Sequence, residues 1–122
     1  MALIKKFEDI IAWLEARNLV ASIYGLTSTG ALARNYGLRD QIQRAAASAM
    51  TNIAEGFDCE SKKEFARFLG IARRSAVEVQ SLPYAAFDVG YINEQIYNTQ
   101  YQEAEKTKAI VGGLKHSITP HD

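Results

Sequence analysis

The fold is decided by two neighbouring stretches, QIQRAAASAMTNIAEGF at Gln41–Phe57 and SKKEFARFLGIARRS at Ser61–Ser75. In and just before the first stretch, apolar residues recur at spacings of three and four, the period of an α-helix. They form one narrow stripe of Leu38, Ile42, Ala46, Ala49 and Ile53. The alanines at positions 45–47 and 49 are small enough to let a neighbouring helix come close. The pattern predicts a helix over residues 38–57.

A second, polar stripe runs along the same helix at the same spacing. Its members are Gln41, Arg44, Ser48, Asn52 and Glu55. One interpretation is the solvated face of a surface helix. The other is a helix packed on two sides, whose polar stripe forms hydrogen bonds inside a bundle or between subunits. In that second case the polar groups must find partners, because a buried polar group without one costs on the order of a few kcal/mol.

Length and composition predict a single domain over residues 1–122. This length is enough for one hydrophobic core and too short for two. Hydrophobic content is 48%, as in ordinary globular proteins, and no apolar run approaches the ~18 residues of a membrane-spanning helix. Acidic residues occur too early for a secretion signal, and the single cysteine, Cys59, excludes an internal disulfide. We therefore expect a cytoplasmic protein without a membrane partner.

Periodicity and capping residues predict four helices, over residues 7–26, 38–57, 61–90 and 93–118. Ser61 with Glu64 has the spacing of a capping box, and Asn93 suits the start of the last helix. Pro83 should kink the third helix by removing its bond to Val79. The first helix has a broad apolar face of Phe7, Ile10, Ile11, Trp13, Leu14, Val20, Ile23 and Tyr24. The expected fold class is all-α, an antiparallel up-and-down four-helix bundle.

Residue patterns that carry catalysis or bind metals are missing. The only histidines are His116 and His121, both near the C-terminal end, so an inward-facing di-metal site cannot be assembled. No phosphate-binding loop and no Ser–His–Asp set is present. Glu55 and Glu78 could pair, but each is better explained as the partner of an arginine. We expect no enzyme, no catalytic residue, no metal, no cofactor and no small-molecule substrate.

Charge is unevenly distributed along a chain whose net charge is zero. Residues 34–74 carry eight bases and five acids, 8 − 5 = +3, whereas residues 75–122 carry three bases and six acids, 3 − 6 = −3. On the third helix, Lys63, Arg67 and Arg74 fall close to one face, where they could contact successive phosphates. The alternative is a solvated face or salt bridges between subunits. The candidate nucleic-acid-binding residues are Arg39, Arg44, Lys63, Arg67 and Arg74.

The two deciding stretches also carry a family resemblance. The runs LRDQIQRAAASAMTNIAEGF, SKKEFARFLGIARRSAVEVQ and GYI, with FEDIIAWLEARNLVASIYGLT near the start, resemble the 23S rRNA intervening-sequence protein family of bacterial four-helix-bundle proteins. The resemblance implies a bundle that assembles into a closed ring, typically a homopentamer. Related accessory proteins of diversity-generating retroelements share that assembly and bind nucleic acid and a reverse transcriptase. RNA, DNA or a nucleoprotein is therefore an expected partner.

The family pattern falls on particular positions of this chain. Its polar members give a candidate packing or oligomer network of Gln41, Ser48, Asn52, Glu55, Ser75 and Glu78. Arg74 departs from the pattern, since relatives usually have glycine there, and the near-neutral net charge departs from the basic character of nucleic-acid-binding relatives. Two functional hypotheses result. The first is a ring-forming module that binds RNA or a nucleoprotein, and the second is a structural or adaptor homo-oligomer that binds a protein partner.

Overall fold

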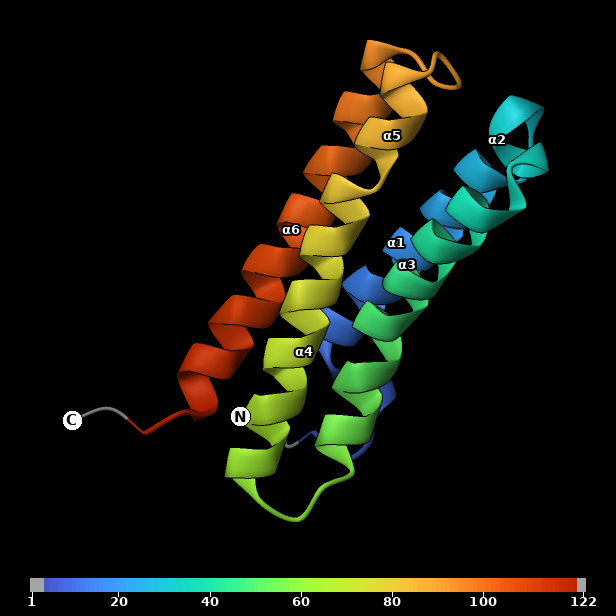
Figure 1. The fold of residues 1–122 in the computed structure, drawn as a ribbon. Helices are drawn as coiled ribbons and strands as arrows, with labels where there is room; N and C mark the ends of the chain where they lie inside the picture. The colour runs from blue at the N-terminus through green and yellow to red at the C-terminus, as the bar shows by residue number, and fades with distance from the viewer. Residues whose placement is uncertain (1–3, 121–122) are drawn as a thin grey trace.

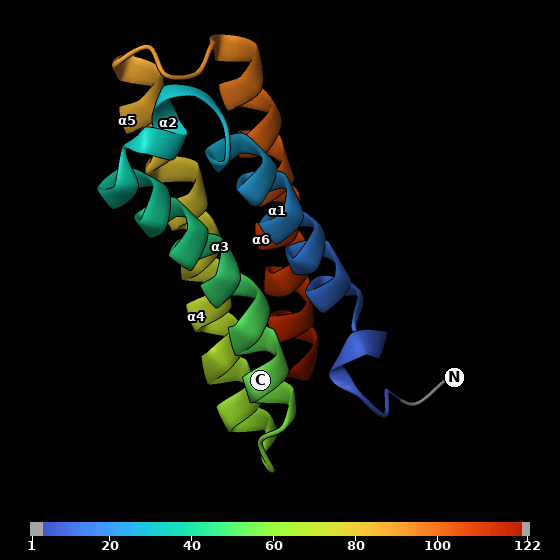
Figure 2. The same ribbon diagram turned by 90° about the vertical axis from the view of Figure 1, so that its right-hand side faces the viewer.

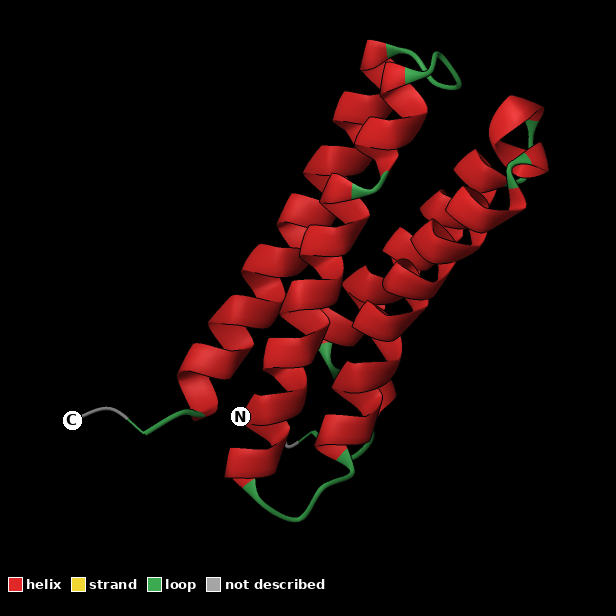
Figure 3. Ribbon diagram, in the orientation of Figure 1, coloured by secondary structure: helices red, strands yellow, loops and turns green. Residues whose placement is uncertain are grey.

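The computed structural model describes residues 4–120, which form helices joined by loops and contain no strand (Figure 3). Four helices are long: α1 (Ile11–Thr27), α3 (Tyr36–Phe57), α4 (Lys62–Ser81) and α6 (Glu94–Ile118). Three short elements flank them: the 3-10 turn η1 (Phe7–Asp9), α2 (Gly30–Arg34) and α5 (Pro83–Asp88). The all-α prediction is confirmed.

The four long helices pack side by side in a closed sequence of neighbours. Helix α3 packs between α1 and α4, and α6 packs between α4 and α1. Helix α1 is therefore diagonal to α4 across the core, and α3 is diagonal to α6. Successive long helices run in opposite directions (Figures 1 and 2). The arrangement is that of an antiparallel up-and-down four-helix bundle.

The contact between α3 and α4 is built from small residues. Ala46 and Ala49 of α3 and Ala72 and Ala76 of α4 are fully buried. Near the end of α3, a β-carbon added at Gly56 would lie only 2.6 Å from the Phe68 β-carbon on α4. The two helices can approach this closely because no larger side chain separates them.

Side-chain caps define where most of the long helices begin. Ser61 Oγ accepts a hydrogen bond from the Glu64 backbone N–H at 3.1 Å, and Asn93 Oδ1 accepts one from Ile96 at 2.8 Å. Both predicted caps are confirmed. A third cap was missed: Asn35 Oδ1 accepts from the Leu38 backbone N–H at 3.1 Å, so α3 begins at Tyr36, two residues earlier than predicted.

Two predicted helix ranges are wrong in detail. The range 7–26 is interrupted at Ile10, whose extended backbone (φ −83°, ψ 120°) separates η1 from α1 while its side chain, 2% exposed, anchors the segment in the core. The range 61–90 is divided between Ser81 and Pro83. Proline has no N–H to donate, so it serves as the first residue of a new helix, α5, and the predicted kink is present as a break.

The predicted apolar face of the first helix is too broad. Ile11, Leu14 and Tyr24 are 71%, 42% and 47% exposed. The side of α1 that contacts α3 and α6 is instead formed by Ala12, Ala16, Leu19, Ile23 and Thr27, all buried. A helix with two neighbours buries only part of its circumference, so the outer apolar residues remain at the surface.

Candidate nucleic-acid interface

Three of the predicted cations lie along one exposed side of α4. Lys63, Arg67 and Arg74 are separated by four and seven residues, which places them on nearly the same helix face, and all three are exposed. From Lys63 to Arg74 the row is about 16 Å long, at about 1.5 Å per residue. Consecutive phosphates of an extended strand could be contacted along such a row.

Arg67 is held close to its own helix. Its Nε atom donates to Glu64 Oε2 at 3.1 Å, and the guanidinium carbon lies 4.6 Å from the centre of the Phe68 ring. The Arg67 side chain is nevertheless 57% exposed. Arg67 is therefore oriented and accessible, with its charge partly compensated by Glu64.

Arg44 belongs to α3, the helix that packs against α4. Together with Gln41, Ser48 and Glu78 it lines a hollow of about 300 Å³ between α3 and α4. Within residues 4–120, Arg44 forms no ion pair, even though Glu78 lines the same hollow. Lys63 and Arg74 likewise form none, so three of the predicted cations keep an uncompensated charge.

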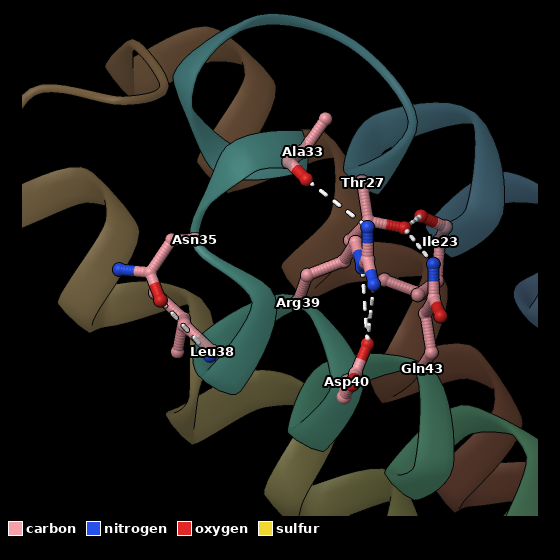
Figure 4. A network of polar contacts seen from close by, with 8 residues as sticks. All are labelled: Ile23, Thr27, Ala33, Asn35, Leu38, Arg39, Asp40 and Gln43. Atoms are coloured by element: carbon pink, nitrogen blue, oxygen red, sulfur yellow. Dashed lines mark hydrogen bonds and ion pairs between the residues drawn. The ribbon is translucent and has the colours of Figure 1, made fainter.

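Arg39 does not belong to this surface. Its Nη1 atom donates to the Ala33 carbonyl at 3.1 Å, and its Nη2 atom lies 3.0 Å from Asp40 Oδ1 (Figure 4). The guanidinium also stacks over the Tyr36 ring at 4.7 Å. These contacts hold Arg39 at the junction of α2 and α3, at the end of the bundle opposite the α3–α4 loop (Figure 1).

The predicted polar network is formed in part. Ser48 Oγ and Ser75 Oγ are hydrogen-bonded across α3 and α4 at 2.8 Å, and Asn52 Nδ2 donates to Ser48 Oγ at 3.0 Å. Ser75 is only 3% exposed. Gln41 and Glu78 line the adjoining hollow without joining these bonds, and Glu55 is exposed.

A further polar cluster between α4 and α6 was not predicted. Gln80 Nε2 donates to Glu105 Oε2 at 2.7 Å, and Lys108 Nζ lies 3.0 Å from the same oxygen. These bonds, with a smaller coulombic contribution from Arg73, lower the pKa of the Glu105 carboxyl. The three-residue spacing of Glu105 and Lys108 could have indicated their ion pair, but no sequence signal indicates the contact with Gln80.

One buried amide lacks partners. Gln100 of α6 is 3% exposed, and neither its Nε2 nor its Oε1 atom has a hydrogen-bond partner among the described residues. It lies beside the bond from Ser22 Oγ to Glu103 Oε1 (3.0 Å), which joins α1 to α6. Such an amide destabilises the bundle.

The exposed side chains at the start of α1, Ile11 and Leu14, belong to a larger hollow. Ile4, Ile11 and Leu14 line it together with residues of α6, and its volume is about 750 Å³. Glu8 and Asp9 stand at its rim. Exposed apolar surface with a polar rim is typical of protein contacts.

Among residues 4–120, no three His, Cys, Asp or Glu side chains gather closely enough to hold a metal ion. Over the same residues, none of the helices combines the length and the apolar character needed to cross a membrane.

Known proteins resemble this chain in fold and in sequence. A crystal structure of a protein of unknown function from the S23 ribosomal protein family of Bacteroides thetaiotaomicron superposes with a TM-score of 0.80, covering 87% of this chain and 96% of the other. At 17% identity this likeness shows a shared fold alone. No curated protein matches the chain. The family model described as "23S rRNA-intervening sequence protein" matches residues 8–113. Because that match spans most of the sequence, the chain belongs to the 23S rRNA-intervening sequence protein family.

Proposed function

We propose that this protein is a non-enzymatic helical bundle that binds RNA, or a nucleoprotein containing it, through the outer surface of α3 and α4. The observation that carries the proposal is the row of Lys63, Arg67 and Arg74 on α4, with Arg44 on the neighbouring helix α3. Lys63, Arg74 and Arg44 form no ion pair with an acidic residue and retain their full charge for a phosphate, whereas Arg67 shares its charge with Glu64. The family description, which refers to 23S rRNA, supports RNA as the partner.

The same proposal includes a ring of subunits, with a homopentamer as the expected form, acting in the cytoplasm. A closed ring repeats one basic surface on every subunit and on the same side, so a modest local charge is multiplied by symmetry. The exposed side chains of Ile11 and Leu14, which line one apolar hollow together with Ile4, offer a surface for association between subunits.

Charge reversal of the basic row tests the binding surface. The double variant Arg67→Glu/Arg74→Glu is expected to lose RNA binding while its mass, measured by size exclusion with light scattering, stays that of the wild-type oligomer. Both side chains are exposed, so the fold should persist, which circular dichroism checks. Unchanged RNA affinity in this variant would refute the assignment of RNA binding to this surface.

A second candidate function is a structural or adaptor homo-oligomer that binds a protein partner and has no nucleic-acid role. The apolar hollow around Ile4, Ile11 and Leu14 favours it. In that case the basic residues form bridges between subunits, and Arg67→Glu/Arg74→Glu should dissociate the oligomer. An intact oligomer that has lost RNA binding therefore decides for the first function, and a dissociated one for the second.

A further inference from the structure

Two cations meet in the groove between α4 and α6, outside the basic row described above. The sequence Gly70-Ile-Ala-Arg73 on α4 and the sequence Gly112-Gly-Leu-Lys115 on α6 have the same form, a glycine followed three residues later by a cation. The two helices pack against each other in opposite directions. This antiparallel packing brings the cation of each sequence to the glycine of the other.

The distances show this reciprocal arrangement. A β-carbon added at Gly70 would lie 3.7 Å from Lys115 Nζ, and one added at Gly112 would lie 3.6 Å from Arg73 Nε. Three residues of an α-helix rise about 4.5 Å, so the two cationic groups are separated by about one helical turn along the bundle. A single phosphate group could contact both cations across that separation.

The glycines are not required by the packing of the two helices. At both positions an added β-carbon would meet only the neighbouring cation, at an ordinary contact distance, and no backbone or apolar side chain. Glycine is unfavourable inside a helix, so neither position is explained by helix stability. Their effect is to let the side chains of Arg73 and Lys115 lie directly against the opposite helix, with no β-carbon between.

Neither cation is neutralised by an acid. Within residues 4–120, Arg73 and Lys115 form no ion pair. Arg73 interacts electrostatically with the Glu105 carboxylate, but that carboxylate already accepts a hydrogen bond from Gln80 and forms an ion pair with Lys108. Two like charges about one turn apart repel each other, and an anion between them would relieve that repulsion.

We propose that Arg73 and Lys115, above the crossing of Gly70 and Gly112, bind one phosphate group of the RNA backbone. This site extends the proposed function and rests on it for the identity of the ligand, RNA. That the two side chains can bind an anion follows from their geometry alone. Arg73 adjoins Arg74 in the chain, and the two side chains leave α4 on different sides. The strand that contacts the basic row can therefore continue over α4 into this groove.

The test compares Arg73→Gln/Lys115→Gln with a control that removes two charges elsewhere, Lys5→Gln/Arg17→Gln. The control residues are exposed, and Arg17 lies on α1, the helix diagonal to α4. Affinity for a single-stranded RNA oligonucleotide is measured across salt concentrations. Loss of the one phosphate contact that the two cations share should reduce the log–log salt slope by about 0.7, the value for one neutralised phosphate of a single strand. The control should keep the wild-type slope.

A second measurement separates this site from the proposed function. Inorganic pyrophosphate is titrated into ¹⁵N-labelled protein, and saturable shifts are expected at the Gly70 and Gly112 amides in the wild type and not in the Gln double variant. The charge-retaining swap Arg73→Lys/Lys115→Arg should preserve them, which excludes simple misfolding. An unchanged salt slope in the Gln double variant overturns the site, even where Arg67→Glu/Arg74→Glu abolishes RNA binding. Pyrophosphate shifts at both glycines in a protein that does not bind RNA overturn the RNA assignment and identify a free-phosphate site instead.

Discussion

Substitution of Gly56 by alanine tests the closest contact in the bundle. The added β-carbon would lie 2.6 Å from Phe68 Cβ, 3.0 Å from Phe65 Cδ1 and 3.4 Å from the Phe65 carbonyl oxygen. Carbon atoms in contact normally lie about 3.5–4.0 Å apart. Phe68 Cβ is attached directly to the backbone of α4, so rotation of the ring cannot relieve the overlap. Helices α3 and α4 must separate or shift locally.

The expected loss of stability follows from two opposing effects. Overpacking a tight core typically costs about 1–3 kcal/mol, and the overlap at Gly56 places it near the upper end of that range. Alanine returns about 1 kcal/mol because it is the better helix former. The net expectation is that Gly56→Ala lowers the free energy of unfolding by about 2 kcal/mol.

The matched control is Gly113→Ala on α6. A β-carbon at Gly113 would meet no atom within 4 Å, so only the gain in helix propensity, about 0.5–1 kcal/mol, should remain. Urea denaturation followed by circular dichroism measures both variants at equal protein concentration. The reasoning is refuted if Gly56→Ala is stabilised as much as Gly113→Ala, because α3 and α4 could not then be as close as the structure places them.

Three further predictions concern polar groups. Ser75→Ala should lower the free energy of unfolding by about 1 kcal/mol, because the 2.8 Å bond to Ser48 is lost; an unchanged urea midpoint would contradict this. Gln100→Met should raise it by about 1–3 kcal/mol in the same assay, because two unpaired buried polar atoms are removed, and a loss of stability would show that the amide has a partner. The pKa of the Glu105 carboxyl is lowered from its usual value of 4.5, so the ionised carboxylate stabilises the fold at pH values above 4.5. This stabilisation is lost as the pH falls below 4.5 and passes through the lowered pKa. The melting temperature of Glu105→Gln should therefore fall less than that of the wild type below pH 4.5, and equal falls would oppose this assignment.

Helix starts that carry their own caps were predictable from the sequence. Ser61 and Asn93 each precede a periodic segment and accept the expected backbone hydrogen bond. The cap at Asn35 was not predicted, because residues 31–37 show no periodicity and the short helix α2 ends immediately before it. The interruption at Ile10 has a tertiary origin, since burial of that side chain outweighs continuation of the helix.

Which apolar residues of α1 face the core could not be read from the sequence. Ile11 and Leu14 satisfy helical spacing as well as Leu19 and Ile23 do, and only the positions of α3 and α6 decide between them. The polar stripe on α3 shows the same limit. Its spacing indicated a shared face, but the partner Ser75 and the exposure of Glu55 depend on how α4 lies against α3.

The basic surface was predicted better along one helix than between helices. Spacing alone placed Lys63, Arg67 and Arg74 together on α4. Arg39 was included because it is close in sequence, but its bond to the Ala33 carbonyl holds it at the far end of the bundle. The groove pair Arg73 and Lys115 comes from helices distant in the chain, and no sequence spacing relates them.

The most direct test of the central claim is the affinity of the purified wild-type protein for a structured RNA, measured across salt concentrations. The basic row and Arg44 offer four phosphate contacts on each chain. At about 0.7–0.9 for each contact, the log–log slope should be about −3 to −4, and steeper where several subunits engage one RNA. A slope of that size is the predicted result. An absence of binding even at low salt would contradict the nucleic-acid function and leave the protein-binding adaptor as the explanation of this fold.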